Sequence, residues 1–167
     1  RTAVRSAAET LTSRIREAAS RITSEKADAS AAATADFTRI NELTSQIASL
    51  NKDIGVASFE GSPNELLDRR QSAIDELSGL MKIEVDQHPS GSVRILGAGQ
   101  FLVDIGGSEE LNPAFDPANG PVDPALASTL RGGSLSGHLQ GMEAADKQSA
   151  WLDDFSLELR DQFNAIH

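Results

Sequence analysis

The residues best able to do chemistry in this chain are three histidines. His88, His138 and His167 are far apart in the sequence. None is followed three or four residues later by a second good metal ligand, since the one sulfur at that spacing, in Met142, is a poor ligand for hard metals. We therefore interpret all three histidines as structural or solvated side chains.

Carboxylates are abundant, and three pairs are adjacent in the sequence: Asp75-Glu76, Glu109-Glu110 and Asp153-Asp154. Adjacent helical residues point in different directions, so these pairs indicate solvated faces rather than acid/base dyads. The Gly97-x-Gly99 turn lacks the third glycine of a nucleotide-binding loop. We interpret the lone Trp151 as packing at a helix interface. The chain is predicted to have no catalytic residue, no cofactor and no metal site, and not to be an enzyme.

Composition excludes several further classes of function. The 167 residues contain no cysteine, which rules out disulfides and thiolate chemistry. A net charge of −10 disfavours phosphate backbones and anionic membranes, so we predict neither a nucleic acid nor a membrane as partner. No apolar run approaches the length of a membrane span, and the first residues do not form a signal peptide.

The first 54 residues predict one very long helix, because they contain neither glycine nor proline. Small or apolar residues recur there at alternating steps of four and three, a spacing typical of coiled coils. Such a rod must bury its apolar stripe against a partner helix. The alanine-rich stretch 27–35 would let that partner approach closely, and whether the helix continues through it is left open. The stripe comprises Val4, Ala8, Leu11, Ile15, Ala18, Ile22, Ala29, Ala33, Phe37, Ile40, Leu43, Ile47, Leu50 and Ile54.

The rest of the chain changes its period several times. After a loop at 55–61, Ser62, Pro63 and Glu65 predict a capped helix start, and apolar spacing continues that helix to about Met81. Three short strands in a meander follow, then loop chemistry over 106–124. Helical spacing returns after Gly132-Gly133, although two further glycines predict that firm helix begins only near Met142.

These elements predict a mainly α fold with a small β insertion, of the α+β class. The helices should form a long antiparallel rod, or coiled-coil bundle, beside a small antiparallel β domain. We divide the chain into the first part of the rod (1–82), the β domain with its loop (83–131) and the returning helix (132–167). Both ends fall within helical patterns, so we expect a piece of a longer protein.

Three stretches of this chain resemble the flagellar hook-associated protein 1 family of hook–filament junction proteins, in the family's order. The second stretch carries the most specific motif and opens the second helix. The third combines the Gly-x-Leu-x-Gly start of the last helix with its Asn-x-x-His end. The first stretch holds Ile40-Asn41-x-Leu43 and Leu50-Asn51-Lys52; the second holds Ser62, Pro63, Asn64, Glu65, Leu66, Leu67, Asp68 and Arg70; the third holds Gly133, Leu135, Gly137, Asn164 and His167.

The resemblance implies a structural subunit that joins hook to filament, without catalysis. It implies export by the flagellar type III secretion apparatus to an extracellular position in the flagellum. The implied partners are other copies in a ring, the hook protein and the adjoining filament-side junction protein. An export chaperone would bind a terminal region of the family that is absent here, together with the terminal polymerisation regions.

The first helix also offers a candidate assembly contact, namely Arg5, Arg14, Arg16 and Arg21 facing an acidic surface of a neighbour. A solvated face with internal salt bridges explains the same arginines. Two other functions stay open: another flagellar axial protein, similar to flagellin, and a dimeric coiled-coil adaptor or signalling module. The adaptor predicts a parallel dimer, whereas a folded-back rod predicts a monomer.

Overall fold

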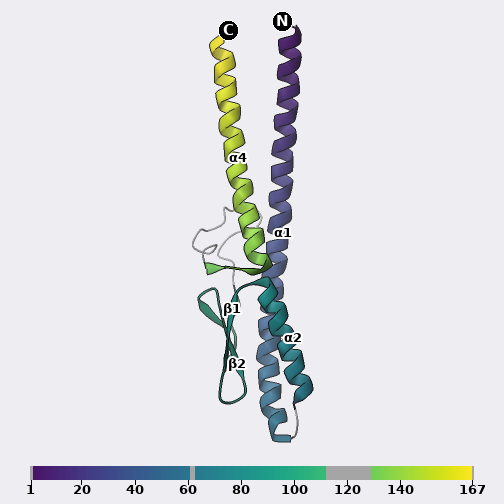
Figure 1. The fold of residues 1–167 in the computed structure, drawn as a ribbon, viewed down its shortest axis with the longest axis vertical. Coiled ribbons are helices and arrows are strands. Elements are labelled where there is room, and N and C mark those ends of the chain that lie inside the picture. The colour runs from purple at the N-terminus through teal and green to yellow at the C-terminus, as the bar shows by residue number, and fades with distance from the viewer. Residues whose placement is uncertain (1, 61–62, 112–128, 167) are drawn as a thin grey trace.

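The computed structural model describes residues 2–60, 63–111 and 129–166 and is organised around one helix, α1 (Thr2–Glu60). Its 59 residues make it about 90 Å long. The helix is continuous through the alanine-rich stretch and through Gly55 (Figure 1). The loop predicted at 55–61 is therefore wrong up to Glu60. A glycine costs a helix only about 1 kcal/mol, and the buried Ile54 beside it holds this turn in place.

The second helix, α2 (Asn64–Leu80), returns antiparallel to α1 and packs against its second half (Figure 1). This confirms the antiparallel arrangement predicted for the helices of the rod. Pro63 stands at the N-cap position, where its carbonyl accepts a 3.0 Å hydrogen bond from the Leu67 amide and no side chain caps the helix. The predicted start with Pro63 as the first helical residue is thus displaced by one position. Ser62, the predicted cap, lies outside the described residues.

The last helix, α4 (Gly133–Ile166), starts beside the end of α2 and packs against the first half of α1. Its start at Gly133 corrects the expectation of firm helix only near Met142. Leu135, Leu139 and Met142 are fully buried, so tertiary packing outweighs the low helix propensity of the glycines between them. Along the length of α1, α4 thus covers the first half and α2 covers the second half.

A four-stranded antiparallel sheet lies beside the rod, in the order β1 (Ile83–Gln87), β2 (Val93–Gly97), β3 (Gln100–Asp104) and β4 (Gly107–Ser108). The first three strands confirm the predicted meander, and β4 is an addition within the region predicted as loop. Val93, Ile95 and Val103 are buried, so one face of the sheet packs on the helices. The remainder of the predicted loop, from residue 112, lies outside the described residues.

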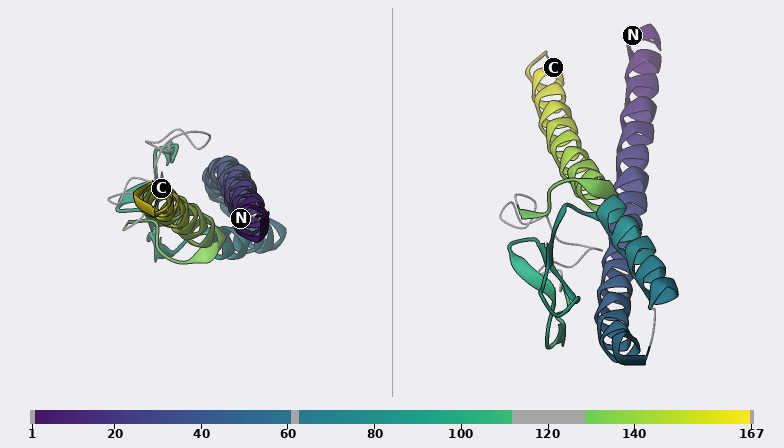
Figure 2. Two further views of the ribbon diagram at one scale, coloured as in Figure 1. Left: turned by 90° about the horizontal axis from the view of Figure 1, so that it is seen from above. Right: turned by 60° about the horizontal axis from the view of Figure 1, so that its bottom comes forward.

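One hydrophobic core joins the three helices to the sheet and occupies the middle of the molecule. From there α1 and α4 diverge toward the N and C termini, which lie at the same end (Figure 2). The predicted class, mainly α with a small antiparallel β insertion, is confirmed. Among the described residues, no helix is long and apolar enough to cross a membrane. The largest fully buried side chains are Ile40, Leu43, Ile47, Leu77, Met81, Ile95, Leu102, Val103, Leu130, Leu135, Leu139 and Met142.

Candidate assembly interface

The motif that opens α2 contains one residue, Arg70, that connects this helix to other parts of the fold. Asn64, Glu65 and Asp68 are exposed in the first turns, and Leu66 and Leu67 are half-buried. Arg70 alone among these residues is buried, with 8% of its surface exposed. A desolvated guanidinium must find hydrogen-bond acceptors within the protein.

Arg70 finds two acceptors, one on α1 and one at the β1–β2 turn. Its Nη1 donates to the Asn51 Oδ1 and to the Gly91 carbonyl, both at 2.9 Å. No carboxylate among the described residues lies within ion-pairing distance of this guanidinium, and its burial lowers its pKa. Arg70 therefore holds the sheet against α1 and α2. The role of this motif residue is structural.

Two asparagines of α1 anchor the segments that lie across it. Asn51 donates from Nδ2 to the Val93 carbonyl at 2.8 Å and accepts from the Val93 amide at 3.1 Å. Asn41 makes the same pair of bonds with Leu111, at 3.2 and 2.8 Å. Each amide thus imitates a neighbouring strand. In the sequence each asparagine directly follows an aliphatic residue of the predicted apolar stripe, Ile40 or Leu50. That position was the signal for a role that our sequence analysis did not assign.

The four arginines predicted as one assembly contact do not share a surface. Arg5 pairs with Glu9 at 3.1 Å on the exposed first turns. Arg16 borders one groove between α1 and α4, whereas Arg14 and Arg21 border another groove together with Gln148 of α4. Neither Arg14 nor Arg21 has a hydrogen bond or ion pair with another described residue.

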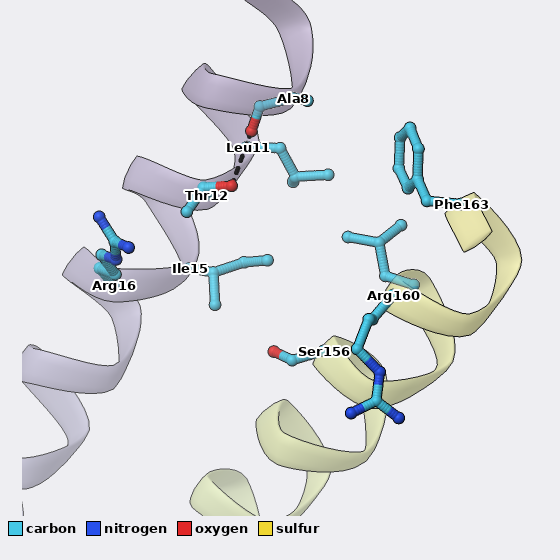
Figure 3. A pocket seen from close by; sticks show the side chains of 9 residues that line it. Ala8, Leu11, Thr12, Ile15, Arg16, Ser156, Arg160 and Phe163 are labelled. Atoms are coloured by element: carbon cyan, nitrogen blue, oxygen red, sulfur yellow. Dashed lines mark hydrogen bonds between the residues drawn. The ribbon is translucent and has the colours of Figure 1, made fainter. Parts of the chain in front are cut away.

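The groove beside Arg16 lies between the diverging helices and has a volume of about 350 Å³. Figure 3 shows Leu11 and Ile15 pointing from α1 toward α4 across it. The Arg16 guanidinium points away from the groove, and Arg160 pairs with Asp161 at 2.8 Å. With this lining the groove fits apolar side chains, as in helix-in-groove recognition. It is lined by Ala8, Leu11, Thr12, Ile15, Arg16, Ser156, Leu159, Arg160 and Phe163.

The hydroxyl groups in this groove do not form a reactive arrangement. Ser156 Oγ donates to the Leu152 carbonyl at 2.7 Å. Thr12 Oγ1 donates to the Ala8 carbonyl at 2.8 Å, the hydrogen bond drawn in Figure 3. Both hydroxyls therefore bond to their own helix backbone, and no histidine lines the groove. The geometry favours packing rather than catalysis.

The histidines lie at separate places in the part of the chain that the structure describes. His88 hydrogen-bonds Ser90 in the β1–β2 turn, at 2.9 Å. His138 lies on α4, 3.7 Å from Asp36 of α1. Asn164 is exposed near the end of α4, and His167 lies outside the described residues. No group of three or more histidines and carboxylates with metal-binding geometry occurs in residues 2–60, 63–111 and 129–166.

Trp151, which we predicted to pack at a helix interface, does not pack at one within this chain. Its side chain is 65% exposed on α4 and stacks on Phe155, with ring centroids 5.5 Å apart. The stripe of α4 that faces α1 passes instead through Leu152, which is buried. The two aromatic rings thus form an exposed apolar surface on the rod.

Comparison with known proteins matches one family over the whole chain. The family model "Flagellar hook-associated protein FlgK helical domain" matches residues 1–167. The flagellar hook-associated protein 1 of Salmonella typhimurium is 29% identical over 146 residues, which cover 77% of this chain and 26% of that protein, and the Salmonella typhi protein gives the same values.

A solved structure shows the same similarity in three dimensions. The flagellar hook junction protein FlgK from Burkholderia pseudomallei matches with a TM-score of 0.67 and 33% sequence identity, over 81% of this chain and 27% of that one. The chain spans about a quarter of the length of these relatives.

Proposed function

Because this chain belongs to the FlgK helical-domain family of flagellar hook-associated proteins, we propose that it is part of a structural subunit that joins hook to filament in the bacterial flagellum. The family match over all 167 residues is the observation that carries this proposal. Its role is mechanical and non-catalytic. The exposed arginines and the apolar groove between α1 and α4 support a role in packing against other protein surfaces.

The proposal includes the partners and the route to the assembly site. The subunit contacts other copies of itself in a ring, the hook protein below and the filament-side junction protein above. It leaves the cell through the flagellar type III secretion apparatus, and an export chaperone binds a part of the longer protein outside these 167 residues. The absence of cysteine suits passage as an unfolded chain.

We also propose that the chain works as one rod with a side region, divided into segments 1–82, 83–131 and 132–167. A single hydrophobic core that includes residues of all three segments supports a rigid unit. Since α2 and α4 bury the apolar stripe of α1 from Ala33 to Ile54 within one chain, this part of the stripe does not require a second chain to bury it. This favours an axial subunit over a parallel coiled-coil adaptor.

Deletion of the gene that encodes this chain, in its host, tests the proposal. Electron microscopy should show hooks without filaments, and a protein blot should show flagellin lost to the culture medium. Complementation with the intact gene should restore filaments. Normal filaments on the deletion strain would contradict the junction role.

A further inference from the structure

The groove between the diverging ends of α1 and α4 has apolar side chains on both of its walls. Leu11 and Ile15 point into it from α1 (Figure 3), and Leu159 and Phe163 line it from α4. Leu11, Ile15 and Leu159 are only half-buried, and Phe163 is exposed. Two apolar stripes of one chain therefore face each other across this groove without full burial.

The two stripes are in register along the rod. Lys26 Nζ lies 2.5 Å from the Asp146 carboxylate, which aligns the antiparallel helices at that level. Both helices rise equally per residue, so each step back along α1 stays level with a step forward along α4. Leu11 is therefore level with the turn of α4 between Leu159 and Phe163. The side chains of the two stripes can interdigitate without any sliding of the helices.

Closer to the core the same two helices are already packed. A Cβ added to Gly141 of α4 would lie 3.7 Å from the Ala29 side chain of α1, which is ordinary van der Waals contact. Met142, Ala145 and Leu152 of α4 are buried. Beyond Leu152 the helices diverge (Figure 2). The open groove is thus the continuation of a packed helix pair, and we call residues 153–163 the outer part of α4.

The first turn of the outer part of α4 has a bond that favours bending. Ser156 Oγ donates to the Leu152 carbonyl at 2.7 Å. A hydroxyl that bonds to the carbonyl four residues earlier competes with the helix backbone and often bends a helix. The bond lies where the packing of α4 on α1 ends, which is the place where a bend would bring the outer part toward α1.

Among the described residues, no hydrogen bond or ion pair joins the outer part of α4 to α1. The charged residues that border the groove do not keep its walls apart. The Arg16 guanidinium points away from the groove, and Arg160 pairs with Asp161 of its own helix at 2.8 Å. An approach of the two walls would therefore bury apolar groups without burying an unpaired charge.

We propose that the outer part of α4 closes onto the first turns of α1 in solution, and that the chain exchanges between this closed form and the open form of the structure. In the closed form Leu159 and Phe163 pack beside Leu11 and Ile15. Removal of apolar surface from water favours this form. The open form offers its apolar stripes to other protein surfaces, and the closed form hides them. The closure concerns this chain alone and does not depend on its role in the flagellum.

Distances between two spin labels, measured by double electron–electron resonance, test the closure. Thr10→Cys and Gln162→Cys place the labels at exposed positions on the two diverging ends, outside the lining of the groove. The chain has no cysteine of its own, so only these two sites are labelled. An excess of unlabelled chain restricts the measurement to distances within one molecule. Two distances are expected: that of the open structure, and a shorter one for packed helices with axes about 8–10 Å apart.

A second pair of labels serves as control. Ala27→Cys and Ala144→Cys place labels at exposed positions beside the Lys26–Asp146 ion pair, where the helices are already packed. This pair should give one distance. The contrast between the two pairs separates closure of the outer part from movement of the whole helix.

Two leucines of α4 provide a matched comparison. Leu159→Gln, in the groove, should lower the ratio of the short to the long distance roughly fivefold, because part of the burial of a leucine is lost. Leu157→Gln should leave the ratio unchanged, since Leu157 is exposed and does not line the groove. A single distance for the labels at positions 10 and 162 would overturn the proposal. So would a short-distance population that Leu159→Gln leaves unchanged, or one that Leu157→Gln lowers equally.

Discussion

A single side chain, Arg70, connects the three parts of this fold that meet at the lower end of the rod. Its guanidinium reaches Asn51 on α1 and the Gly91 carbonyl between β1 and β2. Hydrogen bonds from a charged donor contribute more than neutral ones, and the loss of a buried donor leaves its acceptors unsatisfied. The attachment of the sheet to the rod therefore depends on this residue.

Arg70→Ala should destabilise the chain by about 2–3 kcal/mol, because the buried charged donor is lost together with its hydrogen bonds to Asn51 and to the Gly91 carbonyl. Urea denaturation measures the loss, and hydrogen exchange should locate it at the Val93 and Gly91 amides. The matched control is Arg69→Ala, which removes the neighbouring exposed arginine and should change stability by less than about 0.5 kcal/mol. Equal losses of stability for the two substitutions would contradict the role of Arg70 in attaching the sheet to the helices.

Glu76 makes the stability of the α1–α2 pair depend on pH. Arg39 donates to both oxygens of this carboxylate, at 2.6 and 2.8 Å, and these bonds lower the pKa of Glu76 below its ordinary value of 4.5. The pair therefore stabilises the fold above that ordinary pKa, and this contribution is lost as the pH falls through the lowered pKa.

Glu76→Gln should thus reduce stability at neutral pH, and its difference from the wild type should vanish in acid. Urea midpoints measured from neutral pH down to pH values below the lowered pKa of Glu76 test this. Asp75→Asn serves as control, since the Asp75 side chain accepts a hydrogen bond from the neutral Gln71. A difference that persists unchanged in acid would refute the charged pair.

At the scale of elements, the corner between α2 and α4 decides how the rod is built. Gly132 and Gly133 have φ values of +70° and +72°, a region that favours glycine. A Cβ on Gly133 would lie 2.3 Å from the carbonyl carbon and oxygen of Leu80. The Lys82 amide also donates to the Arg131 carbonyl at 2.9 Å. The start of α4 therefore lies directly against the end of α2.

Gly133→Ala should destabilise the chain by about 3 kcal/mol, because the new methyl group meets backbone atoms and the φ value is strained. Gly137→Ala is the matched substitution one turn later on α4, where the added Cβ meets open space. It should stabilise the helix by about 0.5–1 kcal/mol. Thermal unfolding of both variants measures the contrast, and similar midpoints would argue against a constrained corner.

Sequence periodicity predicted the elements better than their ends. The alternation in β2 and the part of the α1 stripe from Ala33 to Ile54 follow from apolar spacing and are observed as predicted, whereas Val4 at the start of the predicted stripe is exposed. The ends at Glu60 and Gly133 were missed because tertiary packing carried helices through glycines that local propensity treats as breaks. The candidate interface was predicted only as a cluster of arginines, although a spacing of two residues on a helix already places Arg14 and Arg16 on different sides, where they border different grooves.

At the scale of the whole molecule, burial decreases along the rod. The α1 stripe is fully buried from Ile40 to Ile47, where helices and sheet surround it, and only half-buried from Ala8 to Ile22. Stability follows the apolar area removed from water and the packing around it. The middle of the chain should therefore open last.

Leu43→Ala should cost about 2–4 kcal/mol, as truncation in a packed core does, whereas Leu11→Ala should cost less than about 1 kcal/mol. Urea denaturation compares the two leucines of the same helix. Native-state hydrogen exchange should likewise show faster exchange in the first four turns of α1 than around Leu43. Equal losses for the two substitutions would mean that the diverging ends are packed as firmly as the middle.

The divergence of α1 and α4 also has a mechanical consequence. Leu152 is the last residue along α4 that the structure describes as buried, and the 14 residues from there to the end of the helix at Ile166 extend roughly 21 Å. A rotation of about 10° at Leu152 therefore sweeps the tip of the helix through roughly 4 Å, a distance calculated from the same helical rise. A small tilt of α4 relative to α1 at Leu152 therefore produces a larger displacement at the C-terminal end of α4.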